Sequence, residues 1–123
     1  MKLRLLTAAS MALAGTSAHA MDVATFLDKA NALQRKGAMA IFSGEIKVVM
    51  GEINAATKAL RAERLADVAA NRHPKYCPKG GKGGLDQKEL FAAMNSVPDH
   101  LRPRTQVKDA LRTAFAKKYP CPR

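Results

Sequence analysis

The chain has 123 residues, with 21 Lys and Arg against 10 Asp and Glu, and a formal net charge of +11 at pH 7. Hydrophobic residues make up 47% and charged residues 25%, which excludes collagen-like, low-complexity and wholly disordered proteins. The length is that of a single domain, and an Ala- and Leu-rich composition without Trp favours helices. So basic a chain first suggests a nucleic acid, a membrane surface or an acidic partner.

Residues 1–20 have the pattern of a secretory signal peptide. Lys2 and Arg4 precede a largely apolar run at 5–14, and small residues follow it. The run is shorter than the roughly 20 residues that span a membrane, so we expect a cleavable leader and no membrane span. The mature domain would then be residues 21–123 in the periplasm. Export argues against a nucleic-acid partner.

The first half of the mature chain predicts two helices. Apolar positions recur at helical spacing over residues 22–36, and Gly37 ends the pattern. Ser43 is expected to cap a second, longer helix that could reach Asn71. The apolar stripe of this helix consists of Ile46, Val49, Met50, Ile53, Ala56, Leu60 and Val68. Such a long helix cannot bury its stripe alone, so it is expected to pack across the rest of the chain.

The second half predicts two more helices between loops. Residues 72–84 are rich in Pro, Lys and Gly and predict a loop. Asp86, with Glu89 three residues later, is a capping arrangement for a short helix. After a second loop at 99–104, Thr105 is expected to cap the last helix. The expected inward residues are Leu90, Phe91 and Met94, then Val107, Ala110, Leu111, Ala114 and Phe115. We predict a small, compact all-α domain of about four helices.

The two cysteines, Cys77 and Cys121, allow only one intramolecular bridge. The loop-entropy model gives such a bridge about 4 kcal/mol of stabilisation. Free thiols or an intermolecular bridge are the alternatives, and the Cys-Pro context shared by both sites favours closure within one chain. That bridge would make the segment between the cysteines a closed two-helix hairpin.

Catalytic and metal-binding patterns are not found. His73 and His100 fall in predicted loops, with no Ser, Cys or carboxylate at a motif spacing. The Gly- and Lys-rich run at 79–84 is not a phosphate-binding loop, because Gly83 follows Lys82 where that motif needs Ser or Thr. The run is either a solvated loop or a cationic arm for an anionic partner. We expect no enzyme, no cofactor and no metal.

Most of the positive charge lies in the second half. Residues 21–71 carry seven basic and six acidic side chains, a net charge of +1, whereas residues 72–123 carry twelve and four, a net charge of +8. Such asymmetry can attract an acidic protein or a lipid phosphate, or only keep the chain soluble. The residues singled out as contacts for a partner are Lys79, Lys82, Arg102 and Arg104.

Residues 76–123 begin and end with an aromatic residue next to Cys and Pro, and two predicted helices lie between these two ends. The elements of this pattern are Tyr76-Cys77-Pro78, Glu89-Leu90-Phe91, Val97-Pro98, Val107, Ala110-Leu111, Ala114-Phe115 and Tyr119-Pro120-Cys121. The pattern resembles the Rap/Tai immunity proteins of type VI secretion systems. Either Tyr119 fills the aromatic position before Pro120, and the last helix is one turn longer than in that family, or Phe115 does and an insertion follows it.

The resemblance implies a small exported helical protein with a bridge between Cys77 and Cys121. It further implies a periplasmic homodimer that binds a secreted amidase effector and blocks peptidoglycan cleavage. The leading hypothesis is therefore a non-enzymatic periplasmic binding protein of this immunity type. One alternative is a periplasmic stress chaperone of the HdeA type, which opens on acidification; another is an adaptor on anionic envelope polymers or lipids.

Overall fold

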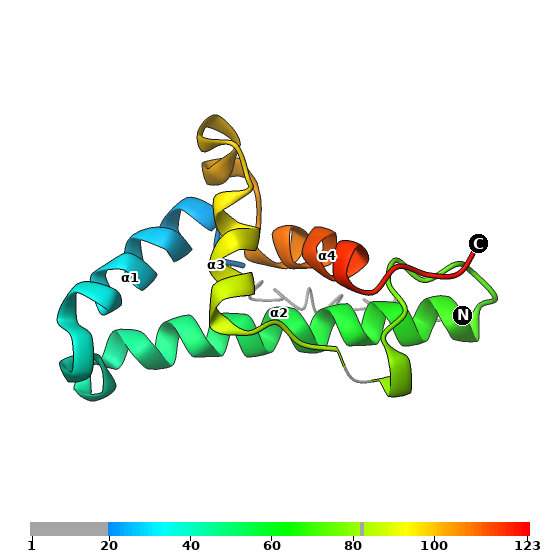
Figure 1. Cartoon of the computed structure of the whole chain (residues 1–123), viewed down its shortest axis with the longest axis horizontal. Helices are drawn as coiled ribbons and strands as arrows, with labels where there is room; N and C mark the ends of the chain where they lie inside the picture. Colours follow the sequence, from blue (N-terminus) through cyan, green and yellow to red (C-terminus); the bar gives the residue numbers. More distant parts are fainter. Residues whose placement is uncertain (1–19, 82) are drawn as a thin grey trace, which may run out of the picture.

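The computed structural model describes residues 20–81 and 83–123, which form helices joined by short connections. The α-helices are α1 (Val23–Lys36), α2 (Gly44–Ala69), α3 (Gln87–Asn95) and α4 (Val107–Lys118), and the 3-10 helices are η1 (Gly37–Phe42), η2 (Lys79–Gly81) and η3 (Asp99–Arg104). The predicted all-α class is confirmed. Figure 1 shows α1 and α4 along one side of the long α2, with α3 standing across it. The predicted leader falls on residues 1–19, outside the described residues.

Three of the helices begin at a side-chain cap. The Asp22 carboxylate accepts a hydrogen bond from the Thr25 amide at 2.8 Å, and the Ser43 hydroxyl accepts one from the Glu45 amide at 3.3 Å. Asp86 caps α3 through a reciprocal box in which each side chain accepts from the other residue's amide at 2.8 Å. The predicted caps at Ser43 and Asp86 are confirmed.

The start of α4 differs from its prediction. Thr105 is not the cap, because its hydroxyl donates to the Leu101 carbonyl at 2.9 Å and Gln106 occupies the cap position without a side-chain hydrogen bond. A backbone ladder replaces the cap: the Val23 amide donates to the Thr105 carbonyl at 2.8 Å, and the Val107 amide donates to the Met21 carbonyl at 2.9 Å. Tertiary pairing of the two chain segments therefore substitutes for a local cap.

The predicted ends of other elements also change. α2 ends at Ala69, earlier than Asn71, which has a left-handed φ of 54°. The expected loop at 99–104 is the 3-10 helix η3, and the expected loop at 72–84 contains the short η2. Pro103 inside η3 lacks an amide hydrogen and cannot donate to the carbonyl three or four residues before it, so it limits the length of this helix.

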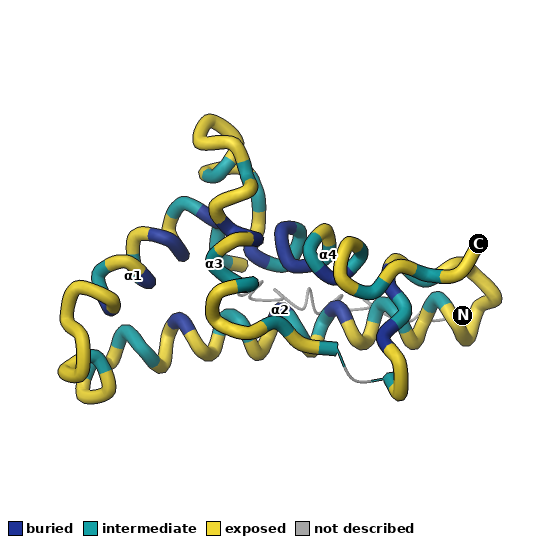
Figure 2. The backbone as a smooth tube through the Cα atoms, viewed as in Figure 1, coloured by how far each residue is buried: buried dark blue, intermediate teal, exposed yellow. Residues whose placement is uncertain are grey.

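The core lies where α1, α3 and α4 meet over α2, as Figure 2 shows. Its fully buried large side chains are Val23, Phe26, Leu60, Met94, Val107 and Leu111. Only Val49, Ala56 and Leu60 of the predicted α2 stripe are buried. Met50 and Val68 of the same stripe are 49% and 55% exposed within the single chain. Leu90, Phe91 and Ala114 are partly buried against the core.

The disulfide joins Cys77 and Cys121, as predicted for an intramolecular bridge. Next to it, Tyr76 stacks on Phe115 with ring centroids 5.1 Å apart, and Phe115 stacks on Tyr119 at 6.1 Å. α4 runs unbroken to Lys118, and Tyr119 follows it directly before Pro120. The bridge thus closes the predicted two-helix hairpin, and α2 packs across it.

Candidate binding surface

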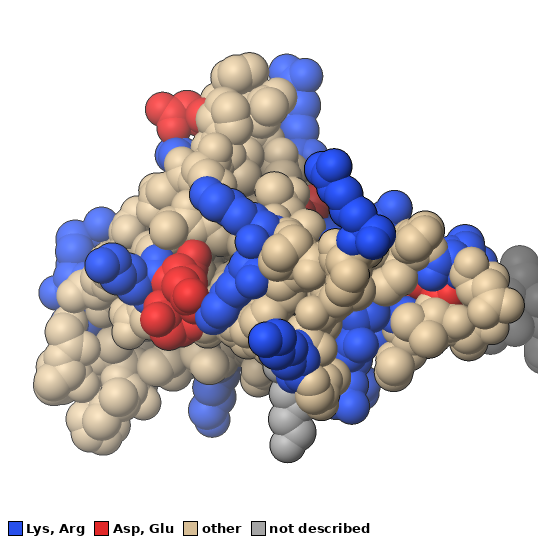
Figure 3. All heavy atoms as spheres, turned by 45° about the vertical axis from the view of Figure 1, so that its right-hand side comes forward, with Lys and Arg blue, Asp and Glu red and all other residues tan. Residues whose placement is uncertain are grey.

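Lys and Arg side chains are spread widely over the face shown in Figure 3, whereas Asp and Glu side chains gather in a few places. Five of the basic residues in 72–123 form ion pairs, namely Arg72, Arg102, Lys108, Arg112 and Lys118. The basic residues without an ion pair to any described residue are Lys75, Lys79, Lys88, Arg104, Lys117 and Arg123. Pairing removes part of the predicted positive field and leaves specific cations available to a partner.

An ion-pair cluster joins α2 to α4. Glu63 on α2 accepts from Arg112 at 2.9 Å and from Lys108 at 3.2 Å, and Asp109 contacts Arg112 on its other side at 2.6 Å. Partial burial alone would raise the pKa of Glu63, but the hydrogen bonds from Arg112 and Lys108 outweigh it and hold the pKa below its ordinary value. The cluster therefore fixes how α2 lies on the hairpin.

Replacement of Glu63 by Gln should weaken this junction and change its pH dependence. The carboxylate is 40% exposed, so we expect a loss of only about 0.5–1 kcal/mol at neutral pH and low salt. Because the folded pKa is lowered, the stabilisation is present above the ordinary pKa near 4.5 and is lost as the pH falls through the lower, folded value.

The measurement is urea unfolding of wild type and Glu63→Gln from pH 7 down to pH 3. The two curves should converge at the acid end. Asp28→Asn, at an exposed position without an ion pair to a described residue, is the matched control and should leave stability unchanged. A constant difference between wild type and Glu63→Gln at every pH would contradict the assignment.

A second set of contacts holds the loop before α3 against the end of α4. Lys118 donates to Glu89 at 2.7 Å and to the Gly84 carbonyl at 2.9 Å, and the Tyr119 hydroxyl donates to the same carbonyl at 3.0 Å. The hydrogen bond between Lys118 and Glu89 raises the pKa of the lysine and lowers the pKa of the carboxyl. A Cβ at Gly83 would lie 3.2 Å from the Tyr119 ring, so the chain passes closely there.

The η3 segment projects from the junction between α3 and α4, at the top of Figure 1. Arg102 anchors it from within, because its guanidinium donates to the Val97 carbonyl at 2.9 Å and to the Asn95 carbonyl at 3.0 Å. The same group pairs with Asp99 at 2.7 Å, and its side chain is only 24% exposed. Arg104 is the last residue of η3 and is exposed. Of these two predicted contacts, only Arg104 is free for a partner.

The other two predicted contacts lie elsewhere. Lys79 begins η2 and is exposed, and Lys82 falls outside the described residues. Arg64 on α2 holds η2 in place by donating to the Gly81 carbonyl at 3.0 Å, while its guanidinium lies 5.5 Å from the Tyr76 ring centroid. η2 and η3 occupy opposite edges of the molecule in Figure 1. Lys79 and Arg104 therefore belong to two separate surfaces.

An apolar surface at the other end of the molecule was not predicted as a site. Met39, Ile41 and Phe42 of η1 are 66%, 68% and 79% exposed, which is unusual for side chains of this size. A well lined by α1, η1, α2 and α3 opens beside them. The available sequence signal was the apolar run at 38–42, which joins two helices without belonging to either stripe.

Metal-ligand clusters and membrane-spanning helices are absent from the described residues. Within 20–81 and 83–123, no three His, Cys, Asp or Glu side chains lie together as metal ligands. His73 and His100 are both exposed. No helix in the described part of the chain has the length and apolar character to cross a membrane. No protein-family model, curated protein or solved structure matches the chain.

Proposed function

We propose that the chain is a non-enzymatic periplasmic binding protein of the immunity type, which inhibits a secreted peptidoglycan amidase. The observation that carries this proposal is η3, a projecting segment whose backbone is fixed by Arg102 and whose free cation is Arg104. A projection that is rigid before binding loses little conformational entropy when it enters a cleft. The resemblance of residues 76–123 to Rap/Tai immunity proteins supplies the class of partner.

The charge of the hairpin supports an acidic binding face on the partner. Arg104, Lys88 and Lys117 have no ion pair with a described residue and lie in the segment that carries the net charge of +8. Complementary charge accelerates encounter and disfavours basic competitors. This charge complementarity does not require every cation of the hairpin to be buried in the interface. Charges at the rim of an interface act mainly on the association rate.

The contact at Met21 supports processing of the leader. Its backbone nitrogen lies 3.1 Å from a carboxylate oxygen of Glu52, and both residues are partly buried. After cleavage between residues 20 and 21, this nitrogen would be the charged α-amino group, and the hydrogen bond would become an ion pair.

Arg104→Glu tests the proposed contact. Against a secreted amidase encoded beside this chain, we expect wild type to co-purify with the enzyme and to inhibit its cleavage of muramyl peptides. Charge reversal at the tip of η3 should weaken binding about tenfold or more, chiefly through the association rate. Surface plasmon resonance at two salt concentrations measures both rates.

Lys58→Glu is the control for net charge, because Lys58 is also exposed and lies on α2, outside the hairpin. It should change binding much less than Arg104→Glu. Equal effects of the two variants would remove η3 from the interface. Failure of wild type to bind or inhibit any neighbouring amidase would overturn the proposed function itself.

A further inference from the structure

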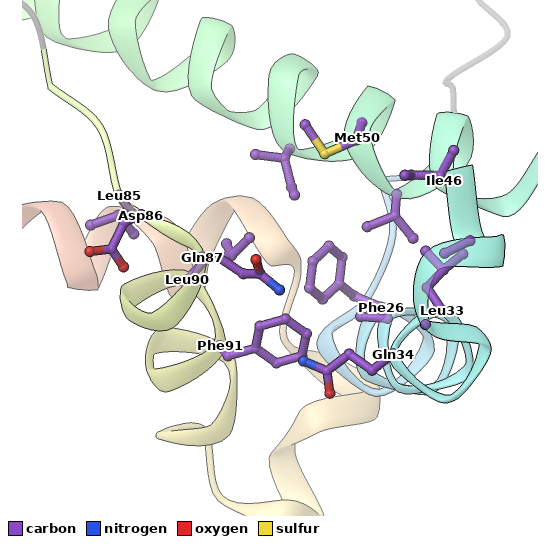
Figure 4. Close-up of a pocket in the computed structure, with 15 residues that line it drawn as sticks. Phe26, Leu33, Gln34, Ile46, Met50, Leu85, Asp86, Gln87, Leu90 and Phe91 are labelled. Atoms are coloured by element: carbon purple, nitrogen blue, oxygen red, sulfur yellow. The ribbon is translucent and has the colours of Figure 1, made fainter. Parts of the chain in front are cut away.

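The well between α1, α2 and α3 has a volume of about 520 Å³, within the roughly 300–1,000 Å³ of small-molecule sites. Each of the three helices lines it with large apolar side chains, among them Phe26, Leu33, Val49, Met50, Leu90 and Phe91. Figure 4 shows Phe26 and Phe91 pointing into the space between the helices. The well exists because α3 packs on α4 and faces α1 and α2 across a gap.

The lining selects for an apolar occupant. Among the described residues that line it, Asp86 is the one with an ionisable side chain, and its carboxylate is already engaged in capping α3 through the Glu89 amide. The other polar side chains are the neutral amides of Gln34 and Gln87, which Figure 4 shows beside the two aromatic rings. A ligand with a charge deep in the well would find no opposite charge there, so it would not recover its hydration energy.

The end of the well at η1 has a different character. Gly37 and Ala40 line the well, whereas Met39, Ile41 and Phe42 of the same 3-10 helix are exposed to solvent. Apolar side chains therefore lie both in the well and on the surface of the adjoining η1. A well with so few polar side chains accepts the hydrocarbon part of a ligand.

Two basic residues adjoin this end in the sequence, and the ammonium of one of them, Lys36, donates to the Ser43 hydroxyl at 3.2 Å. Arg35 and Lys36, the last residues of α1, are exposed and directly precede Gly37. The nearest carboxylate in sequence after them, Glu45, is paired with Lys29 at 3.0 Å. An apolar well with cations beside its outer end suits an amphiphile with an anionic head group.

We propose that this well binds a single acyl chain that carries an anionic head, as in a long-chain fatty acid or an anionic lipid. The chain lies against Leu90, Phe91 and Met50, and the head group stays in solvent near Arg35 and Lys36. The ligand site is independent of η3, so it adds a second binding activity to the proposed inhibitor.

Single-tryptophan variants give a direct test, because the chain contains no Trp. Met50 and Val48 lie two residues apart on α2 and are 49% and 46% exposed, but only Met50 lines the well. In Met50→Trp, 9,10-dibromostearate should quench the emission saturably, and oleate should reverse the quenching. In Val48→Trp, the same additions should leave the emission unchanged. Circular dichroism verifies that both variants fold.

Unmodified protein supplies a second measurement, in case the introduced indole of Met50→Trp itself occupies the well. We expect 11-(dansylamino)undecanoic acid to brighten on binding to wild type, laurate to displace it, and dodecyltrimethylammonium to displace it far less. Vesicles of brominated phosphatidylglycerol, added to Met50→Trp, show whether the chain is also taken from a membrane. Quenching by free dibromostearate alone assigns a free fatty acid, and quenching by the vesicles assigns a lipid.

Three results would overturn the proposal: equal quenching of Val48→Trp and Met50→Trp, no brightening of the dansyl probe with wild type, or equal displacement by laurate and the cationic amphiphile. None of these measurements involves an amidase. Loss of acyl-chain binding would therefore leave the inhibitor proposal standing, and loss of amidase binding would leave the acyl-chain site standing.

Discussion

Replacing both Cys77 and Cys121 by Ala is expected to lower the free energy of unfolding by about 4 kcal/mol. The bridge spans 44 residues of sequence, and the loop-entropy model gives this magnitude for a loop of that length. A domain of this size has about 5–15 kcal/mol of total stability, so the loss is a large share of it. The double variant avoids a free thiol that would form new disulfides.

Urea unfolding followed by circular dichroism measures the effect. Wild type in dithiothreitol is the control, since chemical reduction should reproduce the loss seen in the double variant. The stack of Tyr76, Phe115 and Tyr119 beside the bridge remains in both cases, so the difference reports the covalent link. A decrease of the free energy of unfolding below about 1 kcal/mol would mean that these aromatic contacts alone hold the chain around residues 77 and 121 together without the disulfide.

Leu60→Ala should destabilise the domain by about 3 kcal/mol, the second large effect. Leu60 is 1% exposed and lies on the face of α2 that joins the core of α1, α3 and α4. Truncation removes its apolar contacts and leaves a cavity that the surrounding helices cannot fully fill. We expect the urea midpoint to fall while the slope of the transition is unchanged.

Leu65→Ala is the matched control on the same helix. Leu65 is 51% exposed, so the same chemical change should shift stability by no more than about 0.5 kcal/mol. Similar losses at the two positions would contradict the placement of the core on one face of α2. They would indicate instead that the outer face of α2 is covered in solution, as a homodimer would require.

Local chemistry made several features predictable. The caps at Ser43 and Asp86 depend only on a side chain and amides two or three residues away, and both form as expected. The end of the first helix at Gly37 is also local, because its φ of 56° favours glycine. The pairing of Cys77 with Cys121 followed from the even count and their shared sequence context.

Other features depend on residues far apart in the chain. Thr105 has the side chain of a cap, but its position is set by pairing with residues 21–23. Arg102 belongs to a cationic segment, yet backbone carbonyls of the preceding turn hold its guanidinium, so it is not free for a partner. The residue type alone does not tell whether a Thr caps a helix or whether an Arg is free for a partner. The hydrogen bonds that decide this come from groups that only the folded chain brings together.

The net charge of +11 and the apolar periodicity determined by themselves that this is a basic, all-α chain with its positive charge in the second half. Only the tertiary structure decided which cations are paired, where η2 and η3 lie, and that Met50 faces an open well beside the exposed η1. Helical spacing states which residues share a face, since it is a property of one helix. It does not state whether a neighbour covers that face, because that depends on how far apart the helices stand.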